Sequence, residues 1–215
     1  MPTCHSAWRP WQVTARTDRR VDLTYTHDAG AAGWIWPYRA EMSLSLTSRA
    51  LTWRLAVINL HPSRAMPAGL GLHPYLADCD DGLLAGVVKT HWPAGADRIP
   101  AGPEPVPADL PLDGSRPLPR GVDVGFGGCA GRAAPASPAG GRRVMMTGDA
   151  LFSHLMVYTP TGRGFFVSNW LATPSMVSTW RCAVSPAPGG AIWRRVKATS
   201  GRSHSPSKWP LAKMW

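Results

Sequence analysis

The chain has 215 residues, 44% of them hydrophobic, and its 23 Lys+Arg against 13 Asp+Glu give a formal net charge of +10. This length supports one sizeable globular domain or two small ones and excludes a disulfide-stapled mini-protein, and the apolar content excludes a disordered chain. No apolar run approaches the roughly 18 to 20 residues of a membrane helix, and the first residues show no secretory signal, so we expect a soluble cytoplasmic protein.

The positive charge is concentrated in the last third of the chain. The last carboxylate is Asp149, and eight basic residues follow it; residues 1–149 hold the other 15 basic and all 13 acidic residues, a net charge of +2. A basic tail of this kind could bind a polyanion, but no signature of a nucleic-acid-binding fold accompanies it, so we expect no nucleic-acid partner. Four isolated cysteines without a CxxC pair favour reduced thiols and predict no metal site.

The first half of the chain shows strand alternation rather than helical periodicity. Leu23 and Tyr25 alternate with threonines, and two longer alternating runs within Met42–Leu60 are joined by a polar link at 47–50. Apolar side chains at every second position are typical of half-buried strands. We therefore predict one strand near Leu23 and an antiparallel hairpin over Met42–Leu60.

The second half adds a proline-rich crossing and a further strand pair. Pro93–Arg120 contains eight prolines, which predicts an extended surface segment, and the Ala/Pro/Gly-rich stretch Gly131–Arg143 predicts a mobile loop. Alternation predicts a strand at Leu155–Tyr158 with a return strand at Gly164–Val167. Many short strands separated by Pro/Gly turns indicate an all-β sandwich or barrel.

The densest group of chemically informative residues is the segment NLHPSRAMPAGLGLHPY, which runs from Asn59 to Tyr75. Pro74 keeps His73 out of the α region, so the imidazole is presented from an extended segment. A histidine in that setting can donate a proton near neutral pH. The alternative is that His73 is a hydrogen-bonded core histidine.

This segment belongs to a longer run that resembles the aldose 1-epimerase (galactose mutarotase-like) family. The run is GWIWPYRAEMSLSLTSRALTWRLAVINLHPSRAMPAGLGLHPY, and the likeness extends to RPWQV before it and to GVDVGF and FSHLMVYTPTGRGFF after it. In all, it covers roughly residues 8 to 180. The resemblance implies an antiparallel β-sandwich with a sugar site, no cofactor, and interconversion of the α and β anomers of an aldohexose such as glucose or galactose.

The resemblance also implies roles for individual residues. His73 corresponds to the histidine that protonates the ring oxygen, and Tyr75 follows it in the same motif as a sugar contact. Asp123 in GVDVGF corresponds to the aspartate that holds sugar hydroxyls, although Val124 and Gly125 replace the residues expected beside it. His5 stands near the place of the family's first histidine, but it lacks the glycine that normally follows.

The family's proton acceptor has no acidic counterpart here. It is a glutamate in a strand that follows the Phe-rich run, and that place falls at Ser168 or Asn169 in FFVSNWLATP. Neutral Ser or Asn cannot take up the proton, so this sequence predicts a loss of roughly 10²–10⁴ in rate by the family route. Glu41 could replace the base only through a rearrangement of the fold.

Both ends depart from the family pattern, so we expect a partial sandwich domain over residues 1–180 and an irregular basic tail over 181–215. The family's upstream strands have no counterpart before Met1, which indicates a truncated start. The basic, Trp/Ser-rich C-terminal sequence suggests an altered reading frame. Two other functions stay open. One is a non-catalytic carbohydrate-binding relative that stacks sugars on Trp34, Trp36, Trp53 or Trp92, and the other is polyanion binding by the tail. The oligomeric state stays undetermined.

Overall fold

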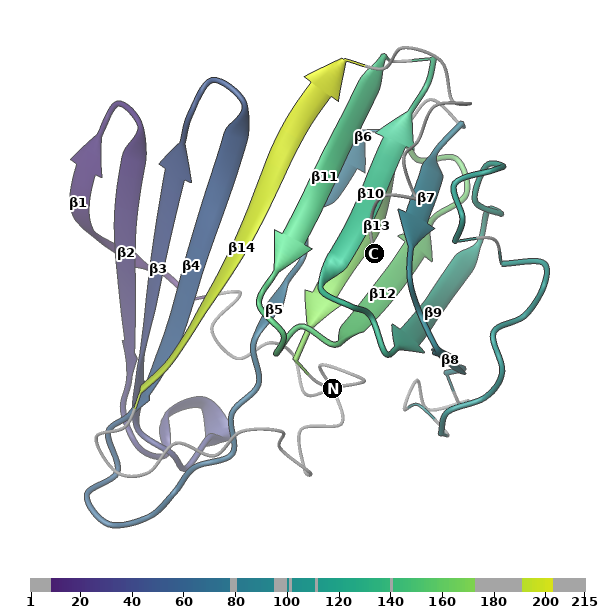
Figure 1. Cartoon of the computed structure of the whole chain (residues 1–215). Coiled ribbons are helices and arrows are strands. Elements are labelled where there is room, and N and C mark those ends of the chain that lie inside the picture. The colour runs from purple at the N-terminus through teal and green to yellow at the C-terminus, as the bar shows by residue number, and fades with distance from the viewer. Residues whose placement is uncertain are drawn as a thin grey trace.

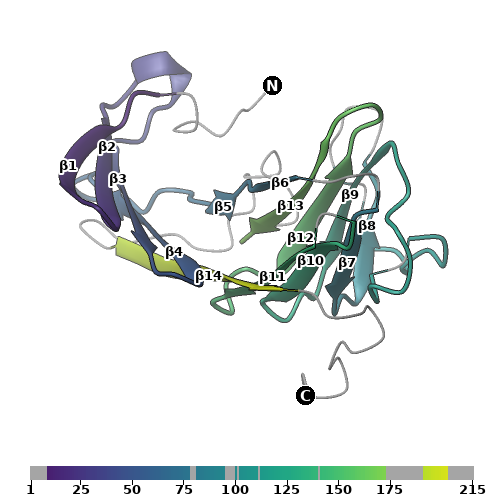
Figure 2. The same cartoon turned by 90° about the horizontal axis from the view of Figure 1, so that it is seen from above.

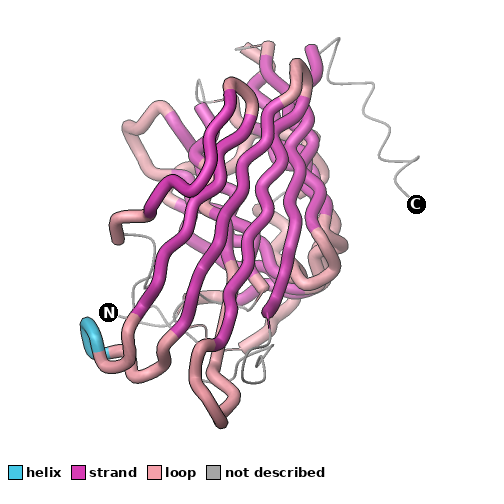
Figure 3. Tube along the Cα trace, turned by 90° about the vertical axis from the view of Figure 1, so that its left-hand side faces the viewer, coloured by secondary structure: helices cyan, strands magenta, loops and turns pink. Residues whose placement is uncertain are grey.

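The fold is an antiparallel β-sandwich, seen in a computed structural model (Figure 1). The structure describes residues 9–77, 81–94, 100, 102–110, 112–139, 141–172 and the backbone of 191–202. Within these ranges the one helical element is the 3-10 turn η1 (Ala31–Gly33), coloured cyan in Figure 3. No helix in the described part of the chain has the length and apolar character needed to span a bilayer.

The larger sheet, formed by eight strands among the described residues, curves around one side of the molecule. Its long N-terminal hairpins lie side by side in Figure 3. The spatial order is β1 (Gln12–Thr17), β2 (Arg20–His27), β3 (Tyr38–Leu46), β4 (Ala50–Asn59), β14 (Ala191–Arg202), β11 (Arg142–Gly148), β10 (Arg132–Ser137) and β7 (Leu83–Gly86). We call it the large sheet.

The second sheet lies along the concave side of the large sheet (Figure 2). In the described part of the chain it contains six strands, and we call it the small sheet. Its spatial order is β5 (Gly71–Leu72), β13 (Phe165–Leu171), β12 (His154–Thr159), β9 (Val122–Gly127) and β8 (Thr90–Trp92), with β6 (Tyr75–Ala77) also paired to β13. All of these pairings are antiparallel.

The main core fills the space between the two sheets. Trp170, Leu155 and Phe126 of the small sheet are at most 1% exposed and pack in one cluster with Leu84 and Met146 of the large sheet. Full burial of each large apolar side chain contributes about 1.5–3 kcal/mol, so this layer holds the sheets face to face. A second cluster, built around Tyr38, Ala40, Val57 and Met66, covers part of the N-terminal hairpins.

The strands predicted from the sequence are all present. The structure confirms the hairpin within Met42–Leu60 as β3 and β4, paired from Tyr38↔Asn59 to Leu46↔Leu51. The strand near Leu23 is β2, and the later pair is β12 with β13. The prediction of an extended segment over Pro93–Arg120 is also confirmed, because its described residues form isolated bridges and no named strand.

The prediction of a mobile loop at Gly131–Arg143 is wrong. Residues 132–137 form β10, which pairs with β7 on one side and β11 on the other. Its ladder with β11 leaves out Ala134 and Pro135, so the missing proline N–H falls where no pairing is required. The small alanines of this strand are buried against the core, a tertiary effect that local composition does not report.

The expectation of an irregular C-terminal tail differs from the structure over residues 191–202. This segment forms β14 in the middle of the large sheet, with nine register pairs to β4 and seven to β11. A strand with neighbours on both edges gains two ladders of hydrogen bonds, which can outweigh weak local alternation. Residues 181–190 and 203–215 of the expected tail lie outside the described residues.

Candidate functional site

Strand register divides the small sheet into a face that packs in the main core and an opposite face. Directly paired residues of antiparallel strands point to the same side, and successive residues alternate. On β13, Trp170, Ser168 and Phe166 therefore face the core, whereas Asn169 lies on the other side. We call that other side the His73 face. By register it carries His73, Tyr75, Asn169, His154, Met156, Tyr158, Asp123, Thr90 and Trp92.

His73 lies in the two-residue break between β5 and β6. Both short strands pair with β13 in one unbroken register, from Leu72↔Trp170 to Tyr75↔Val167. This register brings His73 opposite Asn169, at the roughly 5 Å spacing of neighbouring strands. The His73 side chain is exposed, so it is not a core histidine.

Tyr75 continues the same face beside His73. The two ring centroids are 4.8 Å apart, and Phe165 meets Tyr75 edge to face at 5.1 Å. Tyr75 is nevertheless 65% exposed. An exposed aromatic ring held by a neighbouring ring offers a flat apolar surface next to the His73 imidazole, an arrangement suited to a sugar ring.

Ser168 and Asn169 are the two residues that the resemblance aligns with the family's base, and the strand register puts them on opposite faces of the small sheet. Ser168 is fully buried on the core face, whereas Asn169 is on the His73 face and 4% exposed. The Asn169 Oδ1 atom has no hydrogen-bond partner among the described residues. A buried carboxamide oxygen without a partner is costly in a folded protein unless a ligand or water satisfies it. The position opposite His73 is therefore polar but neutral.

Asp123 supplies a carboxylate on this face, farther from His73. It lies on β9, is exposed, and is paired with Tyr158 of β12. Three strand spacings and two residues along the strands separate it from His73, which corresponds to about 16 Å between Cα atoms. The two residues are thus too far apart to touch each other and can act together only through a ligand between them.

His154 was not among the candidate residues from the sequence. It lies half-buried on β12, and its ring meets Trp92 edge to face at 5.9 Å. Its Nδ1 atom is 3.0 Å from Ser153 Oγ. Burial lowers the pKa of His154 below the ordinary imidazole value, so the neutral ring is favoured at pH 7. The alternation His154, Met156, Tyr158 could have revealed it once β12 was paired with β13.

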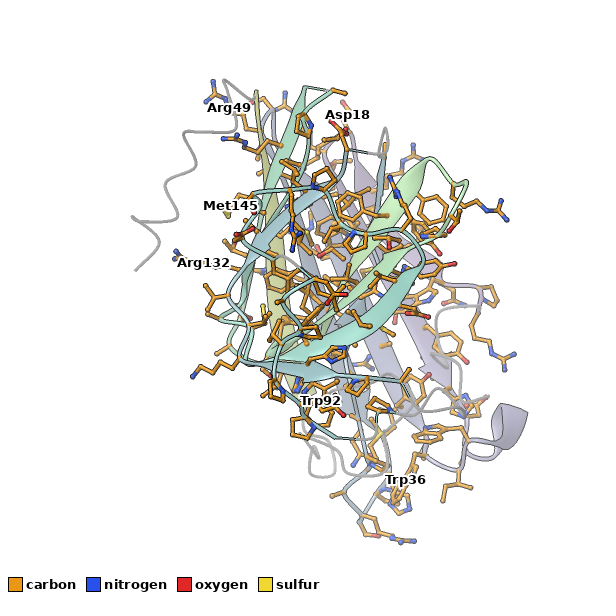
Figure 4. All side chains as sticks on the ribbon, turned by 90° about the vertical axis from the view of Figure 1, so that its right-hand side faces the viewer. Asp18, Trp36, Arg49, Trp92, Arg132 and Met145 are labelled. Atoms are coloured by element: carbon orange, nitrogen blue, oxygen red, sulfur yellow. The ribbon has the colours of Figure 1, made fainter. Side chains whose placement is uncertain are left out.

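The remaining candidates lie elsewhere. Trp36 packs beside the second cluster, with Arg64 5.2 Å above its ring, and Figure 4 shows it toward the end of the molecule opposite Asp18 and Arg49. Trp34 also packs there, and Trp53 packs against the main core. Glu41 is on the large sheet, 2.8 Å from Arg39. His5 lies outside the described residues.

Solved structures share this architecture. An aldose 1-epimerase candidate from Escherichia coli K12 gives a TM-score of 0.82 at 21% identity, over 92% of this chain and 71% of that one. A galactose mutarotase-like protein from Lactobacillus casei ATCC 334 gives a TM-score of 0.75 at 19% identity, over 89% of this chain and 73% of that one. Galactose 1-epimerase from Lactobacillus acidophilus NCFM gives a TM-score of 0.71 at 15% identity, over 90% of this chain and 67% of that one. These likenesses show the fold.

The sequence itself carries the family assignment. No curated protein matches the chain well enough to count as a relative. The aldose 1-epimerase family model, in contrast, matches residues 5–184, which include both sheets up to β13 and the whole His73 face. The chain therefore belongs to the aldose 1-epimerase family.

Proposed function

We propose that this protein binds an aldohexose on the His73 face and interconverts its α and β anomers. The observation that carries the proposal is the register of the small sheet, which brings an exposed histidine, an exposed tyrosine and a carboxylate onto one face. Family membership supplies the sugar class. The unpartnered Asn169 Oδ1 supports a polar ligand on this face, because a sugar hydroxyl would satisfy it.

The chemistry is ring opening followed by reclosure. His73, as an imidazolium, donates a proton to the ring oxygen O5 while a base removes the proton from the anomeric hydroxyl. The C1–O5 bond breaks, its electrons remain on O5, and the C1–O1 bond becomes a carbonyl. Rotation about C1–C2 presents the other face of the carbonyl to O5, and the reverse proton transfers close the ring as either anomer.

Other residues of the His73 face then have parts in holding the sugar. Tyr75 provides a stacking surface for the apolar side of the ring. Asp123, at the far side of the face, accepts hydrogen bonds from hydroxyl groups remote from C1. Asn169 can hold a hydroxyl near C1 but cannot accept its proton. Its neutrality also favours the second candidate function, sugar binding without catalysis.

The test is anomer exchange measured by NMR on glucose and galactose, together with saturation-transfer detection of binding. We expect wild-type protein to exchange anomers faster than the buffer blank, and His73→Ala to lose about 10²–10⁴ of that rate. His61→Ala is the matched control, because His61 lies beside Trp36 and away from the small sheet. Its rate should equal that of wild type.

Three outcomes separate the functions. Exchange that depends on His73 supports the epimerase. Sugar contact without exchange in the wild-type protein supports a carbohydrate-binding relative. Absence of both contact and exchange would reject sugar recognition by the His73 face altogether.

A further inference from the structure

We propose that His154 is the proton acceptor for the anomeric hydroxyl, in place of the carboxylate that position 169 lacks. This inference rests on the proposed function, because it names the base for that reaction. Three features of the small sheet support it: the position of His154 relative to His73, the environment of the His154 ring, and the scarcity of other bases on the same face.

The position follows from register. His154 is paired with Leu171, two residues along β13 from Asn169, so it is a diagonal neighbour of Asn169 on the same face. Such neighbours lie about 7–8 Å apart. His73 flanks Asn169 from the opposite side, on the β5 edge. The two imidazoles are thus separated by two strand spacings, about 12 Å between Cα atoms, with the Asn169 side chain between them.

This arrangement suits a reaction that needs two proton-transfer groups on opposite sides of one sugar ring. The acid must reach O5 and the base must reach O1, and both atoms are bonded to C1. Asn169 lies between the two histidines and carries an oxygen that no described residue satisfies. That oxygen can accept a hydrogen bond from the sugar and orient C1 toward both rings.

The environment of His154 suits a base. Its half-buried ring is held edge to face against Trp92. In the tautomer in which Nδ1–H donates to Ser153 Oγ, 3.0 Å away, Nε2 keeps its lone pair and can accept a proton. Desolvation lowers the pKa of His154, so the ring is ready to accept a proton at neutral pH.

Few other ionisable groups face this ring. On β13 its neighbours are Leu171 and Asn169, and on β9 its direct partner is Gly127. In the described strands that pair with β12, the charged group on the His73 face is Asp123, four residues farther along β9; the exposed Lys89 lies just before β8, which pairs with the other edge of β9. Among the described strands of the small sheet, Asp123 is therefore the rival base.

The proton transfers balance. The reaction begins with His73 protonated and His154 neutral; O1–H gives its proton to Nε2 of His154 as His73 gives its proton to O5. The open-chain aldehyde is thus flanked by a neutral His73 and a protonated His154. On closure O5–H returns its proton to His73 and His154 returns its proton to O1, so the enzyme recovers its starting state without a co-reactant.

The experiment compares wild-type protein, His154→Gln and Asp123→Asn in galactose anomer exchange between about pH 5 and pH 8. We expect His154→Gln to lower kcat by roughly 10²–10⁴ with KM changed only a few-fold, because the amide keeps a polar side chain but cannot accept the proton. Asp123→Asn should act mainly on KM. The wild-type rate should fall toward acid pH, with a midpoint below the ordinary imidazole pKa because burial lowers the pKa of His154, and this limb should vanish in His154→Gln.

Ser153→Ala keeps the histidine and removes the group that fixes its tautomer, so it serves if His154→Gln does not fold. It should lower kcat several-fold and leave KM unchanged. The proposal would be overturned if His154→Gln had the same kcat as wild type, or, where that variant does not fold, if Ser153→Ala did. It would also be overturned if only Asp123→Asn lost kcat. Wild-type protein that neither binds nor converts galactose would instead reject the proposed function, so the two failures are distinguishable.

Discussion

A carboxylate at position 169 should restore the reaction to a protein that has lost its histidine base. We consider the double variant His154→Gln with Asn169→Glu, and as its control His154→Gln with Asn169→Gln. Glu and Gln have the same shape and differ in charge, so the pair isolates proton acceptance at position 169. Because Asn169 is opposite His73, the new carboxylate would lie about 5 Å from the imidazolium.

The expected magnitudes follow from this geometry. At an effective dielectric constant of about 20, two opposite charges 5 Å apart attract by about 3 kcal/mol, which favours the ionised carboxylate beside a protonated His73. A general base supplies about 10²–10⁴ in rate, so Asn169→Glu should recover most of what His154→Gln loses. The site is 4% exposed, so burying the carboxylate should lower the free energy of unfolding by about 1–3 kcal/mol.

The assay is NMR anomer exchange on galactose, with thermal unfolding recorded for each variant. The reasoning is refuted if the Glu and Gln double variants exchange anomers at the same rate while both remain folded and bind the sugar. It is also refuted if Asn169→Glu restores the rate equally well when His73 is replaced by Ala, because the carboxylate is meant to act with that acid.

Three further outcomes are expected. Gly127→Ala should lower stability by about 1–3 kcal/mol in thermal unfolding and weaken sugar binding, because its Cβ would lie 2.6 Å from Trp92 Nε1 and displace that ring. The lowered pKa of His154 means that the unfolded chain binds more protons below about pH 6.5; stability in urea should therefore fall from about pH 7 to pH 5, and less so in His154→Gln. Asp81→Ala should cost about 1–3 kcal/mol in urea unfolding, because the carboxylate accepts hydrogen bonds from Ser137 Oγ and from a backbone N–H in the β10–β11 turn.

Local alternation predicted two parts of the fold in which neighbouring strands are also neighbours in sequence. The β3–β4 hairpin and the β12–β13 pair both follow this rule, and each has one apolar face that fixes its register. For two segments the sequence predicted irregular structure where the protein forms strands, and each of these strands has a partner that is distant in sequence. In β10, Pro135 suggested a loop, yet β7 and β11 pair on either side of it, and β14 is inserted between β4 and β11.

In the candidate site, too, residues that are close in sequence could be predicted, whereas residues brought together by strand pairing could not. The motif around His73 and Tyr75 was visible in the sequence because one short segment contains both residues. The sequence left Ser168 and Asn169 as alternatives, and the pairing of β13 with β5 and β6 was needed to bring Asn169 opposite His73. His154 comes from a different strand, and its relation to His73 exists only through β13, so no linear spacing could reveal it.

The most direct test of the central claim is a galactose titration monitored through the imidazole NMR signals of the labelled protein. The account predicts that the signals of His73 and His154 shift together, with one saturation curve. The signals of His91 and His27 should not move, because His91 faces the core from β8 and His27 is buried on β2 against Trp34 O at 3.0 Å. Movement of His91 or His27 with His73 unchanged would contradict the placement of the sugar on the His73 face.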